Sequence, residues 1–71
     1  MRIEKLVMMA NQIAAFFAIQ GEERAVPQIA KHLMQFWDPR MRTQIIAHVN
    51  ASGAGLTPLA RAGVLQLTQS H

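Results

Sequence analysis

Apolar residues recur every three or four positions along nearly the whole chain, and no stretch sustains an alternation of apolar and polar residues. The first spacing places apolar side chains on one face of an α-helix, whereas alternation is typical of a half-buried β-strand. No segment of the sequence repeats another. We therefore expect an all-α fold, and the length of 71 residues indicates one small domain that covers 1–71.

Helix boundaries follow from the apolar pattern together with the positions of glycine and proline. We expect three main helices and a short C-terminal helix, at about 3–20, 24–37, 39–50 and 58–67. Gly21 suits the end of the first helix. Proline is tolerated only in a first helical turn, so the second helix should start between Glu23 and Pro27. The tail from Gln66 onward is expected to be frayed.

Two dipeptides mark helix starts. In Asp38–Pro39 and Thr57–Pro58, the first side chain can accept a hydrogen bond from a free backbone N–H group, and proline fits the first helical position. These signals predict where the third and the fourth helices begin. Gly63 works against the fourth helix, because glycine in a helix interior costs about 1 kcal/mol relative to alanine.

The first helix carries more apolar surface than one contact face needs. Its apolar residues between Ile3 and Ala18 fall on an arc of roughly 200° at about 100° per residue, whereas a helix on the surface of a domain needs only about 100°. Met8, Ala15 and Ile19 form a second apolar strip on the remaining side. We expect this helix to be covered on two sides.

Hydrophobic residues make up 51% of the sequence, and a chain this small buries only about 60% of the surface that it exposes when unfolded. The apolar runs are too short for a transmembrane helix, and the N-terminal segment lacks the pattern of a signal peptide. We therefore expect no contact with a membrane. The surplus apolar surface should go into the core or against a partner protein.

Metal binding and catalysis find little support in the sequence. The absence of cysteine removes disulfides, thiolate metal sites and cysteine nucleophiles, and it agrees with a reducing cytosol. His32, His48 and His71 have no carboxylate spaced to complete a metal site with them. None of the four acids lies within an apolar stripe, where a general acid would need to be. We expect no catalytic, cofactor-binding or metal-binding residue in this chain.

Nucleic-acid binding is an alternative function. The turn between the second and third helices could belong to a helix-turn-helix motif in which Arg40, Thr43 and Gln44 contact bases. The formal net charge of +3 arises from only seven lysine and arginine residues, which are scattered along the chain. Such sparse positive charge gives weak support for nucleic acid as a partner.

The segment QFWDPRMR holds the features that most favour a protein interface. Its Asp-Pro pair suffices to explain a helix corner but leaves Trp37, Arg40 and Arg42 unexplained. Arg42 falls within the apolar stripe of the third helix, where its methylene groups could also cover the core. Tryptophan and arginine are enriched at interface hot spots. We predict a partner interface that contains Met8, Asn11, Phe16, Ile19, Trp37, Arg40 and Arg42.

Three pieces of the sequence resemble one known family. MANQIAAFF (9–17), FWDPRMR (36–42) and GAGLTPLAR (53–61) are similar, in order and separation, to segments of the small delta subunit of soluble NAD-dependent formate dehydrogenases. With the helix that contains IAKHL, the resemblance covers nearly the whole chain. FWDPRMR is its most specific piece.

The resemblance implies a cytoplasmic complex and a non-catalytic role within it. In such a complex a large alpha subunit carries iron–sulfur clusters and a molybdenum or tungsten bis-pterin guanine dinucleotide centre, where formate is oxidised. The beta and gamma subunits pass the electrons through FMN to NAD. The delta subunit would be an accessory that docks on the alpha subunit and supports its assembly or stability, with no cofactor of its own.

Overall fold

The computed structural model describes residues 1–69, and within them it contains four α-helices and no strand. The helices are α1 (Ile3–Phe17), α2 (Glu22–Phe36), α3 (Pro39–Ala51) and α4 (Pro58–Gln69), and a 3₁₀ turn, η1 (Ala18–Gln20), follows α1. The prediction of an all-α fold with three main helices and a shorter fourth is confirmed.

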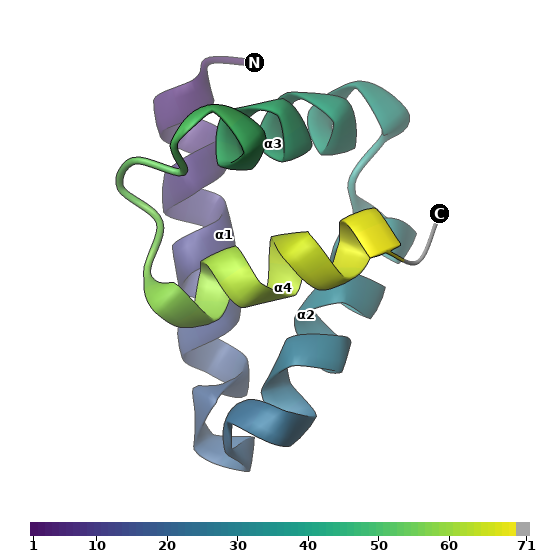
Figure 1. Cartoon of the computed structure of the whole chain (residues 1–71). Helices are drawn as coiled ribbons and strands as arrows, with labels where there is room; N and C mark the ends of the chain where they lie inside the picture. The colour runs from purple at the N-terminus through teal and green to yellow at the C-terminus, as the bar shows by residue number, and fades with distance from the viewer. Residues whose placement is uncertain (70–71) are drawn as a thin grey trace.

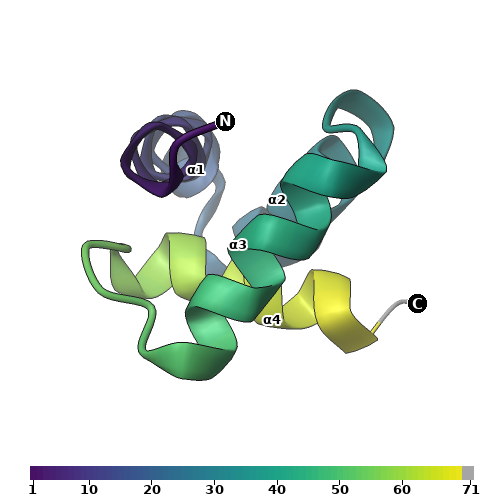
Figure 2. The same cartoon turned by 90° about the horizontal axis from the view of Figure 1, so that it is seen from above.

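The four helices enclose a single core. α1 and α2 form an antiparallel pair joined at one end through η1 (Figure 1). α4 crosses one side of this pair, and α3 lies across the end where α1 begins and α2 ends (Figures 1 and 2). The buried hydrophobic residues are Leu6, Ala10, Ala14, Ala25, Ile29, Ala30, Leu33, Trp37, Ile45, Val49, Ala60, Val64 and Leu67.

Gly21 connects α1 to α2 without a longer loop. Its φ of +88° lies in the region that favours glycine. Its N–H donates to Ala18 O at 3.0 Å, and its carbonyl accepts from Ala25 N at 2.8 Å. The same residue therefore ends η1, as predicted for the first helix end, and caps α2, which starts at once with Glu22.

Pro27 lies inside α2, beyond its first turn. The predicted start of this helix between Glu23 and Pro27 is therefore wrong, and α2 also ends at Phe36 rather than at Trp37. A proline leaves the carbonyl four residues earlier without its helical partner, which here is the carbonyl of Glu23. Both residues are exposed, so water can satisfy that carbonyl and the helix tolerates the proline.

Asp38 and Thr57 cap the helices that follow them, as predicted. Asp38 Oδ1 accepts from Met41 N at 2.9 Å, and Thr57 Oγ1 accepts from Ala60 N at 3.2 Å. α3 and α4 begin at the prolines that were predicted to open them. Each cap fixes a helix start from within one turn of the chain, which is why the sequence alone locates both.

α4 continues beyond its predicted end, as far as Gln69. Thr68 Oγ1 donates to Val64 O at 2.9 Å, which supports the last turn. Residues 66–69, which were predicted to belong to a frayed tail, form the last turn of α4, where Leu67 is buried. Ser70 and His71, the rest of that tail, lie outside the described residues.

Gly63 allows α4 to lie directly on α2. A Cβ atom at this position would come within 2.4 Å of Ile29 Cγ2 and 2.8 Å of Ile29 Cβ, so no larger residue fits without displacement. In the described part of the chain, α2 and α4 form the most extensively packed pair of helices. The glycine that the sequence pattern counted against this helix is thus a requirement of its packing.

We expect Gly63→Ala to lower the free energy of unfolding by about 1–2 kcal/mol, despite the higher helix propensity of alanine, because the added methyl group must displace Ile29. In a chain that already carries Ile29→Ala, the same substitution should cost less. Urea denaturation of the wild type, the two single variants and the double variant, followed by the fluorescence of Trp37, gives the coupling free energy between the two sites. A coupling near zero would contradict the close contact.

Candidate protein-interaction surface

A groove lies between α1 and α2, on the side of this pair that α4 does not cover. Its volume is about 480 Å³, and no residue of α4 contributes to its lining. The lining consists of Met9, Gln12, Ile13, Phe16, Phe17, His32, Phe36, Trp37 and Met41. Most of these side chains are apolar or aromatic, which suits the binding of apolar groups.

Four aromatic rings connect the two walls of the groove. Phe16 and Phe17 lie edge to face on α1, with their centroids 5.1 Å apart. Phe17 lies 6.1 Å from His32 of α2, and His32 lies 4.7 Å from Phe36. Edge-to-face contacts are a favourable arrangement of such rings. The series holds the rings of α1 against those of α2 and so sets the shape of the groove.

The two outer rings of this series face solvent. Phe16 is 75% exposed and Phe36 is 70% exposed, whereas the neighbouring Trp37 is only 4% exposed. The helical pattern had placed Phe16 on the arc directed at the core, but that arc is wider than the other helices can cover. Exposed apolar surface that is gathered in one place is typical of interaction sites. The groove therefore presents an aromatic ring to solvent at each of its walls.

The predicted interface residues separate into two groups. In the first group the side chains are exposed, and it consists of Met8, Phe16, Ile19 and Arg40. In the second group the side chains make contacts within the chain, and it consists of Asn11, Trp37 and Arg42. All seven residues stay predictions for a partner interface, and two of them, Phe16 and Trp37, line the groove. The second group already has a role in the fold.

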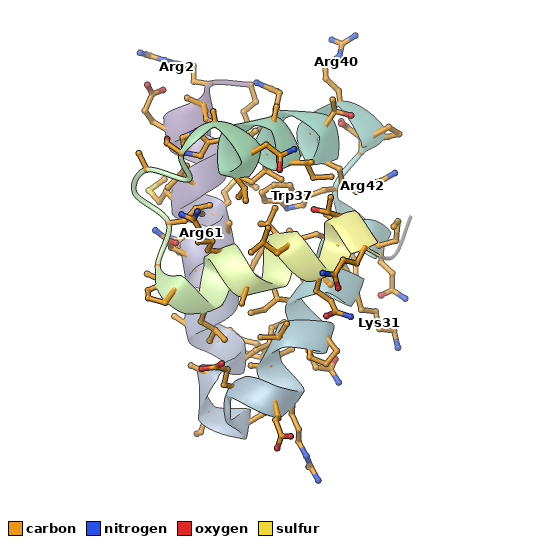
Figure 3. The ribbon with its side chains drawn as sticks, viewed as in Figure 1. Arg2, Lys31, Trp37, Arg40, Arg42 and Arg61 are labelled. Carbon is orange, nitrogen blue, oxygen red and sulfur yellow. The ribbon has the colours of Figure 1, made fainter. Side chains whose placement is uncertain are left out.

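Asn11 ties α1 to the loop between α3 and α4. Its Nδ2 donates to Gly55 O at 2.9 Å, and its Oδ1 accepts from Thr57 N at 2.9 Å. Arg61 holds the same loop through a hydrogen bond to Ser52 O at 3.0 Å, and its side chain lies beside the loop in Figure 3. Asn11 therefore fixes the path of the chain into α4.

Arg42 holds the corner between α2 and α3. Its guanidinium donates to Met34 O at 3.2 Å and also to Trp37 O, two carbonyl groups at the C-terminal end of α2 and just after it. A cation is favourable at that end of a helix. The Nε atom of Arg42 is buried and has no hydrogen-bond partner among residues 1–69. In Figure 3 Arg42 lies near Trp37, whereas Arg40 points away from the body of the protein.

Phe17, His32 and Phe36 belong to the groove but were not predicted as interface residues. A local signal existed for two of them. His32 and Phe36 are four residues apart, so they lie on one face of α2. Phe36 and Trp37 are adjacent at a helix end, where consecutive side chains point in different directions. Only one of the two aromatic residues can therefore enter the core.

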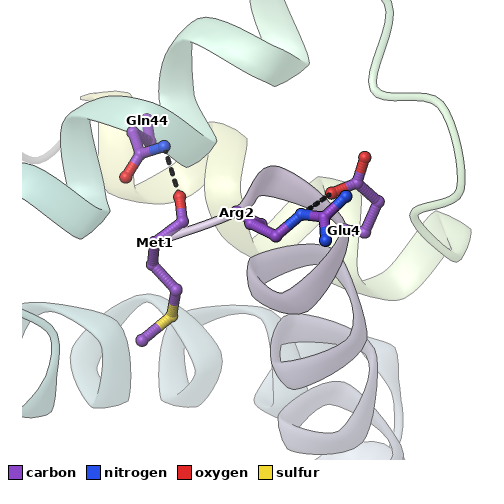
Figure 4. Close-up of polar contacts among 4 residues, drawn as sticks. All are labelled: Met1, Arg2, Glu4 and Gln44. Carbon is purple, nitrogen blue, oxygen red and sulfur yellow. Dashed lines mark hydrogen bonds and ion pairs between the residues drawn. The ribbon is translucent and has the colours of Figure 1, made fainter.

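The helix-turn-helix alternative requires the side chains of Arg40, Thr43 and Gln44 to be free to contact bases. Thr43 Oγ1 donates to Pro39 O at 2.8 Å, and Gln44 Nε2 donates to Met1 O at 2.9 Å (Figure 4). Two of the three side chains that were expected to contact bases are thus engaged within the chain, and Arg40 alone extends outward. The geometry of α3 does not favour binding to nucleic acid.

Metal-ligating side chains do not cluster in the part of the chain that the structure describes. No three His, Cys, Asp or Glu side chains within residues 1–69 lie close enough to share a metal ion. His32 belongs to the ring series, and His48 Nε2 lies 2.8 Å from Ala54 O. His71 lies outside the described residues. Among helices α1 to α4, none is both long enough and apolar enough to cross a membrane.

Comparison with known proteins identifies a family. The model of the NADH-dependent formate dehydrogenase delta subunit family, FdsD, matches residues 5–64. The matched range includes the groove, the corner held by Arg42 and the loop held by Asn11. No curated protein and no solved structure matches the sequence.

Replacement of Arg42 by alanine should lower the free energy of unfolding by about 1–2 kcal/mol, because two carbonyl groups at the end of α2 lose a charged donor. Arg40→Ala is the matched control, since it removes the same charge from an exposed position of the same helix. It should change the free energy of unfolding by no more than about 0.5 kcal/mol. Urea denaturation followed by Trp37 fluorescence measures both values. Equal values would mean that Arg42 does not hold the corner.

Proposed function

The chain belongs to the NADH-dependent formate dehydrogenase delta subunit family, and on this basis we propose that it is a non-catalytic accessory subunit of a formate dehydrogenase complex. In this proposal it docks on the large alpha subunit and supports the assembly or stability of that subunit. The family match over 5–64 carries the proposal, because a delta subunit implies other subunits as its partners.

The groove between α1 and α2 supports a docking role. Phe16 and Phe36 expose most of their rings at its two walls. Removal of apolar surface from water contributes about 25 cal/mol per Å², so contact with a partner at this place is favourable. A subunit that binds only the folded alpha subunit shifts the alpha subunit towards its folded form by mass action.

The redox chemistry of the proposed complex belongs to the other subunits. We place iron–sulfur clusters and a molybdenum or tungsten bis-pterin guanine dinucleotide centre in the alpha subunit, where formate is oxidised to carbon dioxide. The electrons reach NAD through FMN in the beta and gamma subunits. The donor set of this chain does not fit such groups, because it has no cysteine and no cluster of three metal-ligating side chains within residues 1–69.

We place the complex in the cytoplasm. A chain without cysteine needs no oxidising compartment for its fold, and iron–sulfur clusters in a partner require reduced thiolates.

The accessory role can take two forms, which differ in when the chain is bound to the alpha subunit. A permanent subunit stays in the mature enzyme, whereas an assembly factor binds the cofactor-free alpha subunit and then leaves it.

Native mass spectrometry of the active complex, purified from cells that express all its subunits, should detect this chain in a fixed ratio to the alpha subunit. Omission of the chain should lower the yield of active complex, measured as formate-dependent reduction of NAD per cell mass. Detection only with the cofactor-free alpha subunit would replace the permanent subunit by an assembly factor. A chain that elutes alone, with yield and activity unchanged by its omission, would contradict the proposed function.

A further inference from the structure

We propose that the groove between α1 and α2 binds an amphipathic helix of another formate dehydrogenase subunit, with large apolar side chains on one face and acidic side chains at the end that meets α3. This inference rests on the proposed function. It adds the surface through which the chain docks, the chemistry of the segment that it takes and the direction in which that segment lies.

The dimensions of the groove suit a helix. Its α1 wall runs from Met9 to Phe16, which is about 10 Å, or two helical turns, at 1.5 Å per residue. That length takes side chains from positions i, i+4 and i+7 of a bound helix, the pattern of helix-in-groove recognition. A pocket for a small molecule encloses most of its ligand. In this groove, by contrast, the rings of Phe16 and Phe36 are exposed to solvent at the walls.

Positive charge gathers at the α3 end of the groove. Lys5 is exposed and lies one turn before Met9 on the same face of α1. Arg40 is exposed and directly precedes Met41, which lines the groove. The groove lining itself contains no charged residue. Asp38, which directly follows Trp37 of the lining, is exposed at this end as well, so the two cations outnumber the acid by one.

Acidic side chains of the chain balance these cations only in part. Glu4 pairs with Arg2 at 3.7 Å (Figure 4). Asp38 caps α3, but a hydrogen bond from an N–H group does not remove its charge, so Asp38 offsets one of the two cations. The two remaining acids, Glu22 and Glu23, lie with Arg24 in the first turn of α2, at the end of the α1–α2 pair that is remote from α3 (Figure 1). Lys5, Arg40 and Asp38 together leave one positive charge at the α3 end, and Glu22, Glu23 and Arg24 leave one negative charge at the other, so an acidic side chain is favoured at the α3 end. This asymmetry orients the bound helix.

A second copy of this chain is a poorer occupant. Each copy carries a formal net charge of +3, so two copies repel one another. Two concave surfaces placed face to face also leave both of them unfilled. An amphipathic helix has a convex apolar face, which can fill the concave groove.

The apolar part of the inference is tested with the double variant Phe16→Ala/Phe36→Ala and the complex purified from cells that lack this chain. Association of the labelled chain with that complex should weaken about 30-fold or more, as for the loss of a hot spot. The control is Leu65→Ala on α4, a residue that is 41% exposed outside the groove, and it should leave the affinity unchanged. Circular dichroism checks that all variants remain folded.

The charged part is tested with Lys5→Glu/Arg40→Glu. This variant should bind about tenfold more weakly at low salt and should lose most of the salt dependence of the wild-type affinity. Arg24→Glu/Lys31→Glu changes the net charge by the same amount on α2, away from the α3 end, and should have a much smaller effect. Equal effects of the two variants would overturn the direction of the helix and its acidic end.

The outcomes separate this inference from the proposed function. A wild-type chain that does not bind the complex contradicts the proposed function itself. A wild-type chain that binds, together with phenylalanine variants that bind equally well, overturns only the groove as the docking surface. A free chain that sediments as a dimer, and as a monomer after Phe16→Ala, would assign the groove to a second copy and overturn the inference.

Discussion

The contact between Gly63 and Ile29 sets the arrangement of the molecule. Because Gly63 has no side chain, α4 lies directly against Ile29 of α2 and close to one side of the pair formed by α1 and α2. The hydrophobic residues of α4 then fill that side, and α3 covers one end. No further helix of the described chain is left to cover the opposite side. The groove is thus a consequence of how the core is packed.

Two of the three segments that carry the family resemblance, the first and the third, meet in space. Asn11 of the first segment bonds to Gly55 and Thr57 of the third, and in the second segment Asp38 caps α3 while Arg42 binds the end of α2. These polar residues fix the corners of the fold. The sequence did not predict these bonds of Asn11, because its partners lie 44 and 46 residues away, where no spacing rule reaches. A polar residue without a local partner in the sequence can equally have a distant one in the fold.

The sequence predicted the features that act within one helical turn and missed those that depend on neighbours in space. Asp38 and Thr57 bond to N–H groups three residues ahead, so their spacing alone identifies them. Gly63 counts against a helix until Ile29 of another helix is placed beside it. Pro27 counts against a helix interior until the exposure of its position is known. The groove could not be predicted for the same reason. The apolar arc of one helix does not show which part of that arc a neighbouring helix will cover.

Several small side chains are buried in this chain, whereas several large apolar side chains lie on its surface. Small residues fill much of the core, and the buried alanines are Ala10, Ala14, Ala25, Ala30 and Ala60. Large apolar residues remain outside it, among them Met8, Phe16, Ile19 and Phe36. Alanine lets helices approach closely but contributes little apolar area, whereas full burial of one phenylalanine contributes about 1.5–3 kcal/mol. In the proposed complex, a helix that covers the groove adds the apolar burial that the core of so small a chain lacks. The affinity of the chain for its partner then depends on the two rings that its own core leaves exposed.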